Sequence, residues 1–227
     1  MPTSTKERRY PVRDRSIRTE ARILDAARSL LTRIPFEEVT TKRIAAEPGV
    51  SVGALYRFFP NRDSIIDTII RDHIRTLRIR TADEVVRQGL RERNRTGFDL
   101  SVVLHGLIDV YVAYLDEHPD FRTISFGLDF RELSPQRGGA TRSGLTAILY
   151  AFAFEHLYLA FTPEIDRKLR VAREAGECLM GYAYGQPTRE RRDQVIAELE
   201  KMLETYLFPV LSARTQVSKP ARSGAPD

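Results

Sequence analysis

Side chains that could bind phosphate lie close together in one stretch of the chain, Thr40 to Asp63, which reads TTKRIAAEPGVSVGALYRFFPNRD. In a short helix predicted there, Tyr56 and Arg57 share the outward side with Val52 and Gly53. Such a mixture is unusual for a face that only meets water. A tyrosine hydroxyl and an arginine can reach DNA phosphates, while small apolar groups let a helix sink into a groove and contact thymine methyls. The residue types therefore indicate a DNA-reading helix.

Local signals predict the helices that position these side chains. Thr40 or Thr41 can cap a first short helix. That helix must end by Glu47, because the ring of Pro48 disfavours a helical residue before it. Gly49 can then take the positive φ that a sharp turn needs.

A second helix is predicted to follow the turn, with Ser51 as its N-cap. Val50 and Leu55 have the spacing of a hydrophobic staple, which fixes how the chain enters a helix. The second helix should run to about Phe59, and Asn61 can cap a third. Three helices in so short a stretch are typical of a DNA reader whose second helix lies in the major groove.

The stretch also resembles the DNA-binding domain of the tetracycline-repressor (TetR) family of transcription regulators, over roughly Ile17 to Ile70. Phe58 departs from that family, which often has a histidine there, and Pro48 replaces a small or aliphatic residue. The matching features are Phe36, Thr40-Thr41, Ile44-Ala45, Gly49-Val50-Ser51, Ala54-Leu55-Tyr56 and Phe59-Pro60-Asn61-Arg62.

The resemblance implies an all-α protein with an N-terminal three-helix helix-turn-helix DNA-binding domain and a helical C-terminal ligand-binding and dimerisation domain. It implies a transcriptional repressor that binds a palindromic operator as a homodimer and is released by a small apolar or aromatic effector. The sequence shows no motif for a cofactor, a metal or a catalytic residue, and none is expected. The residues implied to contact phosphate are Thr41, Ser51, Tyr56 and Arg62, and those implied to contact bases or backbone are Lys42, Val52, Gly53, Ala54 and Arg57.

Composition agrees with a globular protein. The chain has 227 residues, of which 42% are hydrophobic, so it can bury a sizeable core. No apolar run approaches the roughly 20 residues of a membrane helix, and a cytoplasmic protein without a membrane partner is expected. The single cysteine, Cys178, excludes an internal disulfide, and it is expected to be a small buried residue of a helix rather than a redox sensor.

Positive charge is concentrated at the N-terminal end. The net charge is +5 overall, but residues 1–62 hold 13 basic and 7 acidic residues, whereas residues 63–227 hold 23 and 24. The excess coincides with the predicted DNA reader, where phosphates must be neutralised, and it predicts binding that weakens steeply with salt.

The pattern predicts five segments. Residues 1–15 are basic with few apolar side chains, and such an arm could lie in a minor groove or be an inert tail. Residues 16–34 form an amphipathic helix whose core stripe would include Ile17, Ala21 and Leu31. The expected segments are a basic flexible arm (1–15), the helix-turn-helix domain (16–62), a connecting helix (63–80), a helical effector-binding and dimerisation domain (81–211) and a disordered tail (212–227).

Polar residues on the predicted helix 99–118 allow two interpretations. His105 and Asp109 lie one turn apart, with Asp116 further along the same side. They could be a metal site or orient a ligand. A solvated or salt-bridged stripe is the preferred interpretation, because no other histidine or carboxylate has a diagnostic spacing.

The apolar and aromatic residues of the second half could line a pocket for an apolar or aromatic small molecule, or simply form a helical core. We favour a pocket because the resemblance implies an effector domain. Its candidate residues are Leu104, Tyr111, Phe121, Phe126, Phe152, His156 and Tyr182.

The last two predicted helices, about 164–185 and 189–211, suggest the dimer interface. The second of them is apolar on more than one side, so one side can pack in its own domain and another against a partner. The sequence leaves two other functions open: a helical interaction protein without a DNA role, and an enzyme. The enzyme is the least favoured, because no catalytic set, phosphate loop or metal spacing is present.

Overall fold

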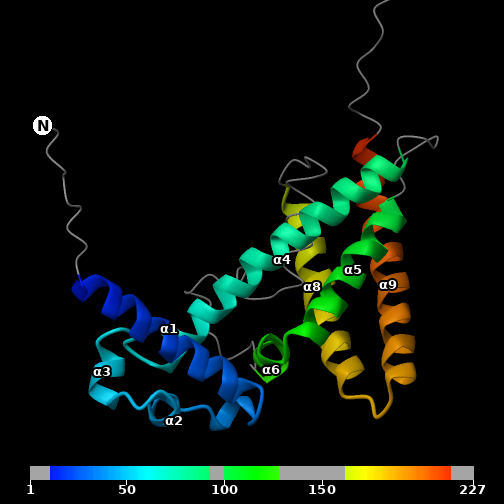
Figure 1. Cartoon of the computed structure of the whole chain (residues 1–227). Helices are drawn as coiled ribbons and strands as arrows, with labels where there is room; N and C mark the ends of the chain where they lie inside the picture. Colours follow the sequence, from blue (N-terminus) through cyan, green and yellow to red (C-terminus); the bar gives the residue numbers. More distant parts are fainter. Residues whose placement is uncertain (1–10, 93–99, 128–161, 216–227) are drawn as a thin grey trace, which may run out of the picture. The chain divides into compact units, whose positions relative to one another are not determined.

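Figure 1 shows a computed structural model of the chain, which describes residues 11–92, 100–127 and 162–215. Every regular element in these ranges is helical, as the sequence predicted. The elements are α1 (Pro11–Leu31), η1 (Phe36–Glu38), α2 (Thr41–Ala46), α3 (Val52–Tyr56), α4 (Arg62–Glu92), α5 (Leu100–Glu117), α6 (Pro119–Gly127), α8 (Pro163–Tyr184) and α9 (Arg189–Thr215).

The chain forms two compact units. Unit 1 comprises Met1–Arg71 and His118–Leu128, and unit 2 comprises Asp72–Glu117 and Asp129–Asp227. The helix α4 is continuous, so it begins in unit 1 and ends in unit 2. Unit 1 also takes in α6, which lies within the segment 81–211 that the sequence pattern treated as one domain.

Several sequence expectations fall outside the described residues. These are the first ten residues of the arm, the aromatic residues at 145–161, which include the pocket candidates Phe152 and His156, and the tail from residue 216 onward. The rest of the expected arm is helical, because α1 begins at Pro11, whose fixed φ suits the first turn of a helix. The helix α4 runs on to Glu92, beyond the expected end of the connecting helix at residue 80.

The buried side of α1 differs from the predicted stripe. Ile23 and Ala27 are fully buried and Leu31 is nearly so, whereas 57% of Ile17 is exposed and Ala21 is exposed too. Including Ile17 and Ala21 in the core stripe was therefore wrong. Their helical spacing is real, but the early turns of α1 lie beyond the core that would bury them.

The turn between α2 and α3 is built around Gly49, which has a φ of 65°. The Val50 N–H donates to the Ala45 carbonyl at 3.1 Å, and the Gly49 N–H donates to the Ala46 carbonyl at 3.2 Å. This Schellman arrangement satisfies carbonyls that the end of α2 would otherwise leave unpaired. The residue before Pro48 is itself helical in φ and ψ, so the glycine turn ends α2 rather than the proline ring.

Three predicted caps are present in unit 1. The Thr40 Oγ1 accepts from the Arg43 N–H at 3.3 Å, and the Ser51 Oγ accepts from the Ala54 N–H at 3.1 Å. The Asn61 Oδ1 accepts from the Ser64 N–H at 2.8 Å. Each bond satisfies a backbone donor of a first helical turn, and together they fix where α2, α3 and α4 begin.

The helix α6 packs closely against α1 and η1. Arg28 of α1 donates to the buried Asp120 carboxylate at 3.2 Å, and Phe121 is fully buried. At the end of α6, a Cβ built on Gly127 would lie only 2.6 Å from the Cβ of Phe36 in η1. Only a residue without a side chain permits this approach.

In unit 2, α8 and α9 lie side by side and α5 packs against α9 (Figure 1). Thr162 caps α8, its Oγ1 accepting from the Ile165 N–H at 3.3 Å. One ion-pair network joins all three helices. Asp116 of α5 accepts from the Tyr184 hydroxyl and from Arg192, each at 2.9 Å.

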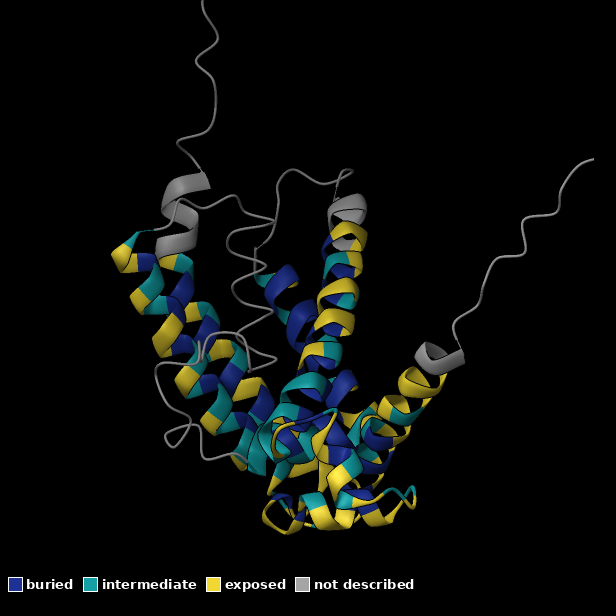
Figure 2. Ribbon diagram, turned by 90° about the vertical axis from the view of Figure 1, so that its left-hand side faces the viewer, coloured by how far each residue is buried: buried dark blue, intermediate teal, exposed yellow. Residues whose placement is uncertain are grey.

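Burial in unit 2 follows one stripe on each helix (Figure 2). Cys178, expected to be buried, is exposed, because it lies away from the stripe that α8 turns inward. No described helix is long and apolar enough to span a bilayer. The buried stripe of α8 consists of Ile165, Leu169, Ala172, Gly176, Met180 and Ala183.

Replacing Gly127 by alanine should destabilise the protein by about 1–3 kcal/mol, because the new Cβ would overlap the Cβ of Phe36, which cannot rotate away. Urea unfolding at equilibrium measures the change. Gly53→Ala is the matched control, since a Cβ there meets nothing within 4 Å. Equal stability of the two variants would contradict the close packing of Gly127 in α6 against Phe36 in η1.

Candidate DNA interface and C-terminal groove

Two hydroxyls predicted to bind phosphate lie together on the surface of unit 1. The Thr41 Oγ1 and the Tyr56 hydroxyl are 3.3 Å apart, which joins the first residue of α2 to the last residue of α3. The side chain of Tyr56 is 49% exposed, although Leu55 beside it is fully buried. The exposed hydroxyl pair is suited to a phosphate oxygen, since a hydroxyl can donate to it.

The cations near this pair differ in whether they have partners. Arg43 is paired with Glu38 at 2.7 Å and Arg33 with Glu47 at 2.8 Å. Lys42 and Arg57 are exposed, and among the described residues neither makes an ion pair or a side-chain hydrogen bond. Their charges therefore remain available to an anion.

The exposed side of α3 carries only short side chains near the start of the helix. A Cβ built on Gly53 would meet nothing within 4 Å, so the packing of the protein itself does not demand glycine there. Val52 and Ala54 are half-buried beside it. A helix without long side chains at these positions can approach base edges closely.

Two predicted phosphate ligands also have structural tasks. The Ser51 hydroxyl oxygen caps α3. The Arg62 guanidinium lies 4.8 Å from the centre of the Phe36 ring and donates to the Val39 carbonyl at 3.4 Å. The sequence does not signal this second role of Arg62, because nothing local indicates that a cation will lie over an aromatic ring far along the chain. Phosphate contact by both residues stays a prediction.

This geometry can be compared with known proteins. Residues 23–69 match the family model for bacterial regulatory proteins of the tetR family. Residues 23–69 therefore form a DNA-binding domain of the tetR-family type. The matched region covers α2, α3 and the turn between them, and it therefore includes the exposed hydroxyl pair and its cations.

Two curated relatives each match a part of the chain. An uncharacterized HTH-type transcriptional regulator of Bacillus subtilis, YvkB, is 36% identical over 55 residues, which cover 24% of this chain and 29% of that protein. The nucleoid occlusion factor SlmA of Haemophilus ducreyi is 32% identical over 73 residues, covering 32% of this chain and 34% of that protein. The likeness thus spans about a third of the length of these relatives.

Solved structures extend the comparison to the rest of the fold. A TetR-family transcriptional regulator from Streptomyces coelicolor superposes with a TM-score of 0.61 at 22% identity, covering 84% of this chain and 98% of that one. A putative tetR family transcription regulator from Shewanella sp. PV-4 gives 0.53 at 18% identity, covering 81% and 96%. At these identities the likeness establishes the tetR-family fold and not a shared ligand.

The candidate ligand residues of this chain are distributed over several places. Leu104 and Tyr111 are buried in α5 of unit 2. Phe121 and Phe126 belong to α6, in unit 1. Tyr182 is 61% exposed on α8. Phe152 and His156 lie outside the described residues, so a role for the set in ligand binding stays a prediction.

The polar residues of α5 form two separate contacts. The His105 Nδ1–H donates to the Ser101 carbonyl at 2.7 Å, so its Nε2 faces the Glu200 carboxylate of α9 at 3.7 Å. Burial raises the pKa of Glu200, His105 opposes that rise and Asp109 adds to it. With Asp116 bound to Arg192, the arrangement agrees with the salt-bridged interpretation. The described residues include no group of three or more side chains able to hold a metal ion.

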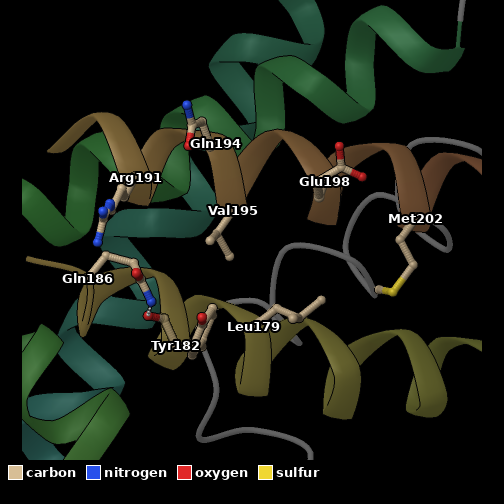
Figure 3. A pocket seen from close by; sticks show the side chains of 8 residues that line it. All are labelled: Leu179, Tyr182, Gln186, Arg191, Gln194, Val195, Glu198 and Met202. Carbon is tan, nitrogen blue, oxygen red and sulfur yellow. Dashed lines mark hydrogen bonds between the residues drawn. The ribbon is translucent and has the colours of Figure 1, made fainter. Parts of the chain in front are cut away.

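A groove of about 660 Å³ runs along the outer side of α8 and α9 (Figure 3). Leu179 of α8 and Val195 of α9 point toward each other across its floor. Polar groups border it, and the Gln186 side chain donates to the Tyr182 carbonyl at 3.1 Å. The residues that line the groove are Leu179, Tyr182, Gln186, Arg191, Gln194, Val195, Glu198 and Met202.

Gly53→Ala should separate folding from DNA binding. The added methyl should leave stability unchanged or raise it by about 0.5 kcal/mol, because alanine is the better helix former. It should weaken operator binding about tenfold, because it thickens the surface that meets the bases. Thermal unfolding and fluorescence anisotropy measure the two effects.

Gly49→Ala is the contrasting variant, since its φ of 65° costs a residue with a Cβ about 1 kcal/mol or more. It should lower the unfolding free energy. Undiminished DNA affinity in Gly53→Ala would refute the close approach of α3 to DNA.

Proposed function

We propose that this chain is a homodimeric, DNA-binding transcriptional regulator, acting as a repressor on a palindromic operator. The exposed Thr41–Tyr56 hydroxyl pair, with Lys42 and Arg57 beside it, is the observation that carries the proposal. The pair lies where the ends of α2 and α3 meet, so it offers two hydroxyls to a phosphate at one place. Because Gly53 has no side chain, α3 can come close enough to the bases to contact them.

Dimerisation is proposed through α8 and α9. A helix-turn-helix protein binds two half-sites when a two-fold axis relates two readers. The outer groove of α8 and α9 supports such an interface, because apolar side chains of both helices form its floor. The exposed side of α8 continues it, with Val171 47% and Tyr182 61% exposed. Charged and amide groups at the border would form the rim.

The effector is proposed to be a small apolar or aromatic molecule bound in the C-terminal part of the chain. The support is compositional, from the aromatic stretch at 145–161 together with the buried Leu104 and Tyr111 of α5. Such residues with a few hydroxyls suit an apolar ligand. Release of the operator by the effector would then make the protein a ligand-responsive repressor.

Tyr56→Ala and Arg57→Ala should each weaken operator binding by about tenfold or more, because each removes a phosphate or base contact worth roughly 1–3 kcal/mol. The operator is first selected from a random-sequence DNA library, and affinities follow from gel shifts at fixed salt. Arg75→Ala is the charge-matched control, since Arg75 is an exposed surface residue of unit 2. Wild-type affinity in both α3 variants would overturn the proposed interface.

Leu179→Glu should convert the dimer to a monomer of 26.0 kDa. A carboxylate buried in an apolar interface without a partner costs several kcal/mol, and the two-fold axis doubles that cost. Light scattering after size-exclusion chromatography measures the mass. Ile79→Glu, at a site that is 59% exposed on α4, is the control and should stay dimeric. A dimeric Leu179→Glu protein would exclude the groove as the interface.

A further inference from the structure

The early turns of α1 carry a stripe of arginines, Arg15, Arg18 and Arg22. Their spacing of three and four residues places them on one side of the helix. All three are exposed, as are most of the neighbouring positions (the yellow turns of α1 at the right of Figure 2). Ile17, on another side of the same turns, is 57% exposed. This part of α1 therefore does not serve the core of unit 1.

One member of the stripe shows where it lies relative to the DNA reader. The Arg22 Nη2 donates to the Pro48 carbonyl in the turn between α2 and α3, at 2.6 Å. The N-cap of α3, Ser51, follows only three residues after Pro48. The N-terminal residues of a reading helix are the ones that contact base edges in the major groove, so Arg22 stands beside the end of α3 expected to enter the groove.

The other two arginines extend positive charge away from that point. Among the described residues, Arg15 and Arg18 make no ion pair and no side-chain hydrogen bond. In the sequence of α1, Asp14 precedes Arg18 by four residues and the exposed Asp25 follows Arg22 by three, whereas Glu20 projects from a different side. The three arginines outnumber the two acids on this side, so the stripe keeps a net positive charge.

We propose that the stripe Arg15-Arg18-Arg22 is a second DNA-contacting surface, which binds the phosphate backbone next to the groove read by α3. The inference rests on the proposed function and adds contacts outside the helix-turn-helix. From Arg15 to Arg22 the stripe covers about 10 Å along the helix axis, at 1.5 Å per residue. Each DNA strand offers a phosphate about every 3.4 Å of duplex axis, so neighbouring arginines can meet neighbouring phosphates.

The helical form of this segment decides how it meets DNA. A flexible arm could enter a minor groove, which is about 6 Å wide. A helix with its side chains is about 10–12 Å across and cannot. The arginines of α1 therefore meet phosphates at the edge of a groove and carry no sequence preference of their own.

The salt dependence of DNA binding tests this surface. Affinity for a mixed-sequence duplex of about 40 base pairs is measured by anisotropy over a series of salt concentrations. The slope of log K against log salt should fall by about 0.9 for each phosphate that the protein no longer neutralises, hence by about 4 for a dimer of Arg15→Ala/Arg18→Ala. The helix should persist, because alanine is the best helix former, and circular dichroism checks it.

Two further variants make the result specific. Arg15→Lys/Arg18→Lys should keep most of the slope, because lysine also neutralises a phosphate. Arg75→Ala, which removes a surface charge in unit 2, should leave the slope unchanged. The proposal is supported if the slope of log K against log salt falls in the double alanine variant and in neither of the other two variants.

Other outcomes overturn it. An unchanged slope in Arg15→Ala/Arg18→Ala, with normal binding by the wild-type protein, would refute the second surface and leave the proposed function standing. An equal reduction in Arg75→Ala would show that only net charge matters and would likewise refute it. Absence of any wild-type binding at low salt would instead refute the proposed function.

Discussion

A helix of five residues is too short to be stable by itself, because it forms very few internal hydrogen bonds after a costly nucleation. The reading helix α3 has this length, so its position depends on what lies at its two ends and beneath it. Gly49 sets the direction of the chain with a φ of 65°, Ser51 caps the first turn, and Leu55 is fully buried. These three constraints fix α3 with no help from its exposed side.

The residues on the exposed side of α3 are not needed for packing, so they can serve the candidate DNA interface. Because burial of Leu55 and the cap of Ser51 hold the helix, Gly53 and Arg57 need not contribute to packing. The hydroxyl contact between Thr41 and Tyr56 links the two short helices at the surface that would meet DNA. Stability and recognition thus use different sides of the same five-residue helix.

Unit 1 extends beyond the three helices that resemble the tetR-family reader. The ion pair of Arg28 with the buried Asp120 and the approach of Gly127 to Phe36 place α6 in the same compact unit. Phe36 also lies under the Arg62 guanidinium. The Phe36 side chain therefore contacts both α6 and the first residue of α4. A displacement of either helix would disturb a residue that lies only a few positions before the start of α2.

The sequence by itself determined the helical class, the caps, the glycine turn and the residues exposed on α3. Each of these depends on groups within a few residues of one another, such as Thr40 with Arg43 or Ser51 with Ala54, so spacing alone defines them. The concentration of positive charge in the N-terminal part was also determined by the sequence, because it follows from counting basic and acidic residues.

Only the tertiary structure decided which side of each helix is buried and which elements belong together. Ile17 has perfect helical spacing but no core to cover it, and Cys178 is apolar but lies off the buried stripe of α8. The grouping of α6 with unit 1 and the packing of Arg62 over Phe36 depend on contacts between residues far apart in the chain. Periodicity gives the direction of a side chain on its helix, but burial requires a neighbour, and the neighbour is chosen by the whole fold.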